Sequence, residues 1–177
     1  MWIARLGSAG VLLSRNYLPK MKAMNWGRFI FISSESAINI PVEMIHYGVT
    51  KTMQLAPARG LAETTAGTGV TVNSVLAGPT RSEGVEKFVD QIAQSRGIER
   101  GSVEKEFFAT VRPSSLLKRF ASTDEAASLV TFIASPLSSA TNGAALRVAI
   151  PTRCHYADSQ ISGSGLFSEA PAIQSYS

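Results

Sequence analysis

Residues 28–34, Arg-Phe-Ile-Phe-Ile-Ser-Ser, decide the fold that is predicted for this chain. The run is short and almost wholly apolar, and it follows the turn pair Trp26-Gly27. That pattern is typical of a strand buried on both faces of a parallel sheet. The strand ends at Ser33-Ser34, and ligands of open α/β sheets bind outside the carboxyl ends of the strands. We therefore expect an α/β fold with a functional site beside Ser34.

Tyr47 and Lys51 stand at the start of the helix expected next, after a loop over residues 35–45. Because they are four residues apart, they share one face of a helix. A free tyrosine has a pKa of about 10, and a nearby ammonium lowers the pKa of a phenol because it favours the phenolate. Such a phenol can donate or remove a proton while a serine hydroxyl, here that of Ser34, holds the substrate oxygen. The three side chains predict proton transfer coupled to hydride transfer.

These residues resemble the catalytic serine, tyrosine and lysine of the short-chain dehydrogenase/reductase family. Ser34 lies thirteen positions before Tyr47, as in that family. The stretch from Val70 to Thr80 resembles the family's next strand and the nicotinamide-side loop after it, and residues 143–148 resemble its last core strand. The resemblance covers residues 10–148 and corresponds to the carboxyl-terminal portion of the family.

The resemblance implies an NAD(P)-dependent oxidoreductase that interconverts an alcohol and a carbonyl. Its cofactor would be NAD or NADP, and its partner a small-molecule alcohol or carbonyl substrate. The implied catalytic residues are Ser34, Tyr47 and Lys51. The residues implied to bind the cofactor are Tyr47, Lys51, Gly78, Pro79 and Thr80. The segments 83–95 and 103–111 are expected to be helices of a lid that covers the substrate.

One part of the family pattern has no counterpart in this sequence. The glycine-rich turn that brings a backbone close to a pyrophosphate is missing, since Gly7 and Gly10 follow no predicted strand. The family's catalytic asparagine would fall near Leu6 or Gly7, where there is none. We therefore expect a partial Rossmann-like, doubly wound parallel sheet over residues 1–150, truncated at its amino-terminal side. The alternative is a non-catalytic fragment of that fold, without the cofactor cradle, that acts at most as a dimerisation module.

Composition narrows the other possibilities. The net charge is +4 without a run of five like charges, so we expect no nucleic-acid partner. No apolar run approaches the roughly 18 residues of a membrane span, so we expect no membrane partner. A single cysteine, Cys154, excludes an internal disulfide and favours a reducing, cytoplasmic location. No cluster of cysteine and histidine has metal-ligand spacing, so no metal site is predicted.

The remaining elements follow from periodicity, caps and breakers. A helix is expected over residues 3–24, interrupted near Pro19, and a second over 44–64, kinked between 53 and 57 by Pro57. These two helices would form any homo-oligomer contact. Ser122 and Glu125 form a capping box that starts a later helix, and the final strand is expected over 144–150. Residues 151–177, rich in Ser, Ala and Gly, are expected to be a divergent, disordered tail.

Overall fold

The computed structural model describes residues 2–149, and its elements follow the expected alternation of helices and strands. In chain order they are α1 (Trp2–Ala23), β1 (Gly27–Ser34), η1 (Glu35–Ala37), η2 (Val42–Met44), α2 (Ile45–Glu63), β2 (Val70–Ala77), α3 (Glu83–Arg96), α4 (Arg100–Thr110), α5 (Thr123–Ala134), η3 (Pro136–Ser138) and β3 (Ala145–Val148), where η marks a 3-10 helix. The predicted tail at 151–177 lies outside the described residues, so the division near residue 150 stays a prediction.

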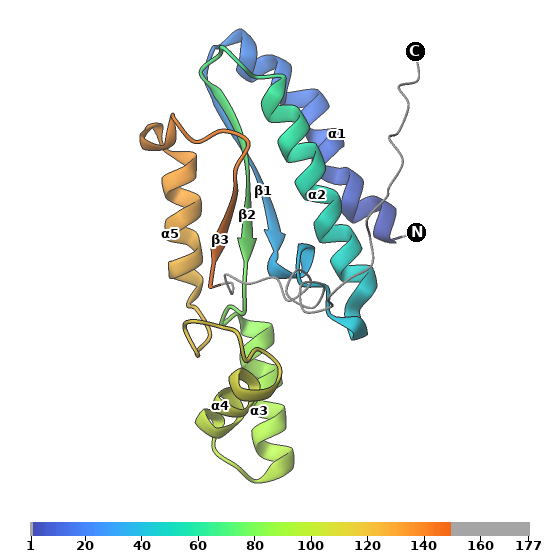
Figure 1. Ribbon diagram of the computed structural model, residues 1–177, viewed down its shortest axis with the longest axis vertical. Coiled ribbons are helices and arrows are strands. Elements are labelled where there is room, and N and C mark those ends of the chain that lie inside the picture. Colours follow the sequence, from blue (N-terminus) through green and yellow to red (C-terminus); the bar gives the residue numbers. More distant parts are fainter. Residues whose placement is uncertain (1, 150–177) are drawn as a thin grey trace, which may run out of the picture.

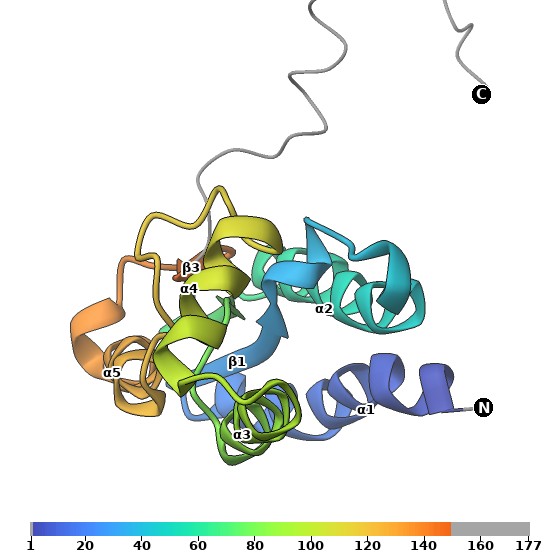
Figure 2. The same cartoon turned by 90° about the horizontal axis from the view of Figure 1, so that it is seen from below.

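The three strands form one parallel sheet in the order β1-β2-β3. The register of β1 against β2 runs from Gly27 opposite Val70 to Ser34 opposite Ala77. Helices α1 and α2 cover one face of the sheet and α5 covers the other (Figures 1 and 2). The predicted α/β class and the Rossmann-like parallel sheet with helices on both faces are confirmed. Because the strands are parallel, their carboxyl ends meet at one edge, where Ser34 and Ala77 end β1 and β2.

The main core lies between the sheet and the α1–α2 layer. Its buried members are Leu18, Phe31, Ala58, Ala62, Val70 and Val72. Two alanines four residues apart give α2 a flat surface, which lets the helix approach the strands closely. On the other face, Ile133 of α5 is fully buried. Both faces of the sheet are therefore packed, and the packing fixes where β1, β2 and α2 present their side chains.

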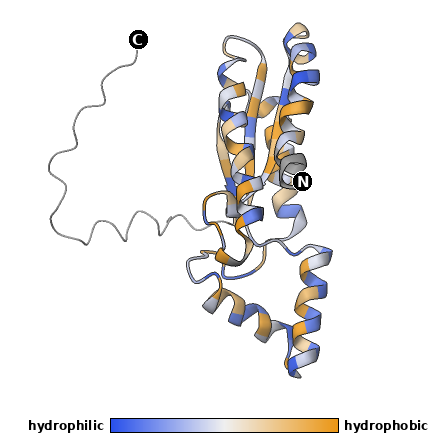
Figure 3. Cartoon of the chain, turned by 90° about the vertical axis from the view of Figure 1, so that its right-hand side faces the viewer, coloured by the Kyte–Doolittle hydropathy of each residue, from blue (hydrophilic) through white to orange (hydrophobic). Residues whose placement is uncertain are grey.

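Helices α3 and α4 extend beyond the carboxyl edge of the sheet, away from the main core (Figures 1 and 3). Hydrophobic and hydrophilic residues alternate along both helices (Figure 3). Apolar residues of the two helices pack together. The resulting second cluster consists of Val89, Ala93, Val103, Phe108 and Phe120. Ser82 caps α3 by accepting a hydrogen bond from the N–H of Val85, and Gly97 ends it in a left-handed conformation. The two helices predicted here are confirmed with slightly different bounds, and their role as a lid stays a prediction.

Helices α1 and α2 each contain a proline and continue through it. The predicted break near Pro19 is wrong, because α1 continues through it to Ala23. A proline removes one backbone hydrogen bond, but Leu18 is buried in the core and Met21 packs against the same cluster, which holds the helix together. Likewise α2 is one continuous helix that includes Pro57. The kink predicted there stays a prediction.

The strand β1 is less buried than predicted. Phe31 lies in the core, but the side chain of Ile32 is 50 % exposed. The physical reason is that β1 is the edge strand of the described sheet, so it has a strand neighbour on one side alone.

The capping box of α5 is confirmed, since Ser122 and Glu125 each accept a hydrogen bond from the backbone N–H of the other. Among residues 2–149, no helix has the length and apolar character needed to cross a bilayer.

Candidate active site

A cavity of about 430 Å³ lies at the carboxyl edge of the sheet. Ser34, at the end of β1, and Tyr47, in the first turn of α2, both line it, together with Gly78, Pro79 and Thr80 after β2. Ser34 is 8 % exposed and Tyr47 is 37 % exposed, so the serine sits deep in the wall and the phenol nearer to solvent. The structure therefore brings the predicted serine, the predicted tyrosine and the predicted cofactor loop to one cavity.

The hydroxyl of Ser34 caps a 3-10 helix and still has a proton to donate. It caps η1, because its Oγ accepts a hydrogen bond of 3.2 Å from the N–H of Ser36. A hydroxyl has one proton to donate and two lone pairs that accept. The cap uses a lone pair and so leaves the proton for another acceptor. The serine is thereby held in place by the backbone with its hydrogen-bond donor still available to a ligand in the cavity.

Lys51 lies beside Tyr47 on the same face of α2, as their spacing predicts. Its Nζ is 5.6 Å from the centroid of the Tyr47 ring, and it donates a hydrogen bond of 3.2 Å to the carbonyl of Ile32. Ser33 donates a hydrogen bond of 2.9 Å to the carbonyl of Lys51. Burial lowers the pKa of the Lys51 ammonium from its ordinary value. The two hydrogen bonds of Lys51 join α2 to the end of β1. They therefore hold the Tyr47–Lys51 pair in a fixed position relative to Ser34.

The loop after β2 is hydrogen-bonded through its backbone to two other segments of the chain. The N–H of Gly78 donates to the carbonyl of Val148 at 2.8 Å, and a Cβ built on Gly78 would lie 2.6 Å from the carbonyl oxygen of Ala149. Glycine is therefore required at this position. Further along, the N–H of Ala121 donates to the carbonyl of Pro79 at 3.0 Å. The hydroxyl of Thr80 donates a hydrogen bond of 3.0 Å to the carbonyl of Gly78.

Comparison with known proteins identifies the family. Residues 8–149 match the family model described as enoyl-(acyl carrier protein) reductase. The chain belongs to the short-chain dehydrogenase/reductase family. It is similar to the uncharacterized oxidoreductase YvaG of Bacillus subtilis (48 % identical over 139 residues, 78 % of this chain and 53 % of the relative). It is also similar to D-beta-hydroxybutyrate dehydrogenase of Cupriavidus necator (30 % over 131 residues, 74 % and 50 %). The chain spans about half the length of the curated relatives it matches.

Solved structures of the family have the same fold. The L-sorbose reductase of Gluconobacter frateurii, solved in complex with NADPH and L-sorbose, superimposes with a TM-score of 0.71 at 24 % identity. The match covers 79 % of this chain and 52 % of that chain. At this identity the likeness establishes the fold alone, which agrees with the parallel sheet and helical layers described above.

The family's cofactor can be tested against the residues that are present. Lys51 uses one of its three N–H donors on the Ile32 carbonyl, which leaves donors for the hydroxyls of a ribose. Gly78 lets the backbone pass where a side chain would not fit. These features fit the nicotinamide side of a dinucleotide. Among residues 2–149 there is no glycine-rich turn between a strand and a helix to hold the pyrophosphate.

The sequence predicted the segments that form the other half of the cavity wall, but not which of their residues line it. That half is formed by the loop after Ser34 and by the lid, and its members are Glu35, Met44, Val85, Phe88, Phe107, Arg112 and Phe120. Glu35 is 4 % exposed and accepts a hydrogen bond of 2.6 Å at Oε1 from Nε of Arg112. Its Oε2 is buried and has no partner among the described residues. The adjacent phenylalanines in α4 were the one sequence feature that could have indicated an apolar lid surface.

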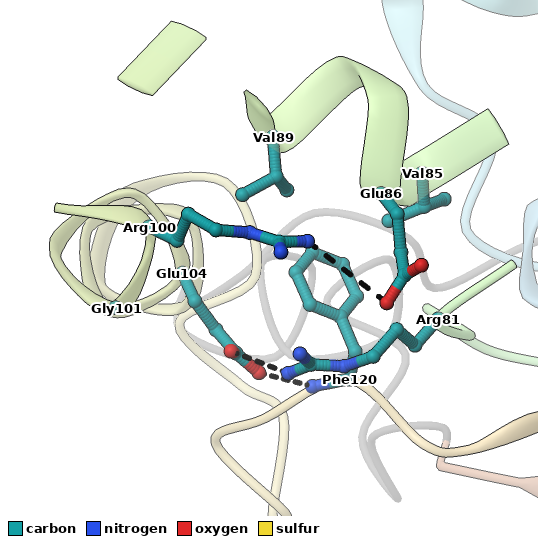
Figure 4. A pocket seen from close by; sticks show the side chains of 8 residues that line it. All are labelled: Arg81, Val85, Glu86, Val89, Arg100, Gly101, Glu104 and Phe120. Atoms are coloured by element: carbon teal, nitrogen blue, oxygen red, sulfur yellow. Dashed lines mark hydrogen bonds and ion pairs between the residues drawn. The ribbon is translucent and has the colours of Figure 1, made fainter. Parts of the chain in front are cut away.

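A second cavity, of about 240 Å³, lies between α3 and α4 (Figure 4). Its charged groups are paired: Nη2 of Arg81 lies 2.7 Å from Oε2 of Glu104, and Arg100 lies 3.9 Å from Glu86. The other oxygen of Glu104 accepts a hydrogen bond of 2.9 Å from the N–H of Phe120. Phe120 lines both cavities. Glu104 therefore braces the lid against the loop after β2, which lines the first cavity.

Proposed function

We propose that this chain forms the catalytic part of an NAD(P)-dependent oxidoreductase that interconverts an alcohol and a carbonyl. The observation that carries the proposal is the convergence of Ser34 and Tyr47 on one cavity, with Lys51 against the tyrosine ring. Membership of the short-chain dehydrogenase/reductase family supports the same chemistry. The proposed catalytic residues are thus the three that the sequence pattern singled out.

The residues divide the reaction among them. The Ser34 hydroxyl donates a hydrogen bond to the carbonyl oxygen of the substrate and fixes its position. The Tyr47 hydroxyl gives its proton to that oxygen as negative charge develops there, and takes it back when an alcohol is oxidised. The bound nicotinamide cofactor supplies or accepts the hydride. The Lys51 ammonium places a positive charge 5.6 Å from the centroid of the phenol ring that exchanges the proton.

The cofactor would be held by Lys51 and Tyr47 together with Gly78, Pro79 and Thr80. Lys51 would donate its remaining N–H groups to the nicotinamide ribose. The loop after β2 would bear on the nicotinamide through its backbone, since its hydrogen bonds to Val148 and Ala121 keep it in one conformation. A preorganised loop lowers the entropy that is lost on binding.

A specific observation also supports the non-catalytic alternative, in which the chain is an association module. The helix α1 exposes the neighbouring apolar side chains Val11, Leu12 and Leu13 and the ring of Tyr17. Contiguous exposed apolar side chains of this kind are typical of contact surfaces. In this reading α1 and α2, predicted as helices 3–24 and 44–64, would pack against a second copy of the chain.

Cofactor binding distinguishes the two proposals. Titration of the protein with NADPH and with NADH, followed by the fluorescence of the reduced nicotinamide, should give a saturable curve for at least one of them. Replacement of Lys51 by Met should weaken that curve, because the ribose loses its donor. If neither nucleotide shows saturable binding up to millimolar concentration, the enzyme reading fails. Sedimentation analysis of the same sample then tests the association module, which requires a dimer.

A further inference from the structure

The lid side of the catalytic cavity indicates which substrates it accepts. Resting on the proposed function, we infer that the substrate is an uncharged carbonyl compound, or its alcohol, with an apolar body of ring size. We also infer that Glu35 excludes carboxylated substrates because it occupies Arg112. Glu35 and Arg112 are in this sense specificity-determining residues, distinct from the groups that act on the carbonyl.

The wall opposite Ser34 and Tyr47 is made of rings. Phe107 and Phe120 lie with their centroids 5.1 Å apart and their planes tilted by 31°, which presents a broad apolar surface. Phe88 of α3 lines the same cavity and is 55 % exposed, although it is a large apolar side chain. An exposed phenylalanine in a cavity wall gains free energy when an apolar ligand covers it. The wall therefore favours an aromatic or alicyclic body on the substrate.

The two charged side chains of the cavity neutralise each other. Among its lining residues, Glu35 and Arg112 are the charged ones. They form an ion pair of 2.6 Å, and the Arg112 guanidinium also lies 5.9 Å from the centroid of the Phe107 ring. A carboxylated substrate that approached Arg112 would meet a guanidinium already neutralised by Glu35, and it would lie beside the Glu35 carboxylate. That arrangement is unfavourable because like charges repel strongly where water is excluded.

Two hydroxyl groups of the cavity wall are committed to backbone carbonyls. Ser33 donates to the carbonyl of Lys51, and Thr80 donates to the carbonyl of Gly78. On the opposite side, the ring wall has no donor or acceptor for additional substrate hydroxyls. A polyhydroxylated substrate would lose hydrogen bonds to water that the ring wall does not replace, and such unpaired groups are strongly disfavoured. The cavity is suited to one reacting oxygen and an apolar remainder.

A pair of matched ketones tests the inference. Acetophenone is neutral, and para-acetylbenzoate has the same ring and ketone with an added carboxylate. With NADPH or NADH in excess, kcat/KM for acetophenone should exceed that for para-acetylbenzoate by tenfold or more, since about 1.4 kcal/mol of repulsion suffices. In the variant Glu35→Gln, which frees Arg112, the ratio of para-acetylbenzoate to acetophenone should rise about tenfold. Dihydroxyacetone should be reduced less well than acetophenone.

Glu106→Gln is the matched control. Glu106 lies on α4 next to Phe107, does not line the cavity, and pairs with Arg96 at 2.8 Å on an exposed surface. This variant removes one carboxylate from the lid as Glu35→Gln removes one from the cavity, but it should leave the substrate ratio unchanged. A ratio that rises equally in both variants would mean that net charge acts at long range, and would overturn the role of Glu35.

Two failures remain distinguishable. If wild type prefers para-acetylbenzoate, or if Glu35→Gln leaves the ratio unchanged, the substrate inference is overturned while the oxidoreductase proposal stands. If neither ketone is reduced, the proposed function is in question, and saturation-transfer NMR decides the substrate inference by binding alone. Acetophenone should then show transfer from the protein and para-acetylbenzoate should not. Equal transfer to both, or transfer to neither, overturns it.

Discussion

Replacement of Glu104 by Ala should destabilise the protein by about 1–4 kcal/mol, because this carboxylate joins three segments. Its side chain is 19 % exposed and bonds to Nη2 of Arg81 and to the N–H of Phe120. Removal leaves the Phe120 N–H without its acceptor, which costs about 1–3 kcal/mol for a buried donor. The lost pair with Arg81, whose side chain is half-exposed, adds about 0.2–1 kcal/mol after solvent screening.

The magnitude is measurable against a total stability of about 5–15 kcal/mol. Urea unfolding followed by circular dichroism gives the free energy of unfolding when the transition has one step. Glu104→Gln should cost less than Glu104→Ala, because the amide oxygen of Gln still accepts a hydrogen bond from the Phe120 N–H. Glu106→Ala, on the same helix, removes an exposed pair with Arg96 and should change the stability by less than about 0.5 kcal/mol.

The relative loss of unfolding free energy in the three variants tests the role of Glu104. If Glu104→Ala costs no more than Glu106→Ala, the carboxylate does not brace the lid, and the loop after β2 is held by its backbone alone. If Glu104→Gln costs as much as Glu104→Ala, the ion pair with Arg81 rather than the bond to Phe120 carries the stabilisation.

Three further predictions concern the sheet, the site lysine and a helix cap. Asn73→Ala should cost about 2–5 kcal/mol in urea unfolding, because the fully buried amide donates to the Thr141 carbonyl and accepts from the Ala144 N–H. Burial lowers the pKa of Lys51, so the folded state binds fewer protons there than the unfolded chain between that lowered pKa and 10.5. The stability of wild type relative to Lys51→Met should therefore rise with pH through this window, and a constant difference would contradict the assignment. Ser122→Ala should lower the melting temperature through loss of about 1 kcal/mol, and Ser122→Asn should restore most of it.

The site could be predicted from sequence where its chemistry is local. The apolar run that ends at Ser34 fixes the strand and its carboxyl end, and the spacing of Tyr47 and Lys51 fixes their common helix face. In each case a period or a cap carries the information, so neighbours in sequence are enough.

The lid side of the cavity could not be predicted in the same way. Glu35 and Arg112 are 77 residues apart, and the sequence around each of them does not predict that they pair. The orientation of α3 and α4 over the cavity depends on packing of the Phe120 segment, which follows α4 by ten residues. Pro19 shows the converse, because core packing of Leu18 outweighs a strong local preference against a proline inside a helix.

The most direct measurement compares two tyrosines that each lie near a lysine, one of which lines the cavity while the other does not. Tyr47 and Tyr17 each lie on a helix with a lysine ammonium near the ring, at 5.6 and 5.9 Å from the ring centroid, but Tyr17 is on the exposed surface of α1. Carbonyl reduction with NADPH or NADH should fall by about 10²- to 10⁴-fold in Tyr47→Phe and stay at the wild-type rate in Tyr17→Phe. Turnover by Tyr47→Phe at the wild-type rate would contradict the account.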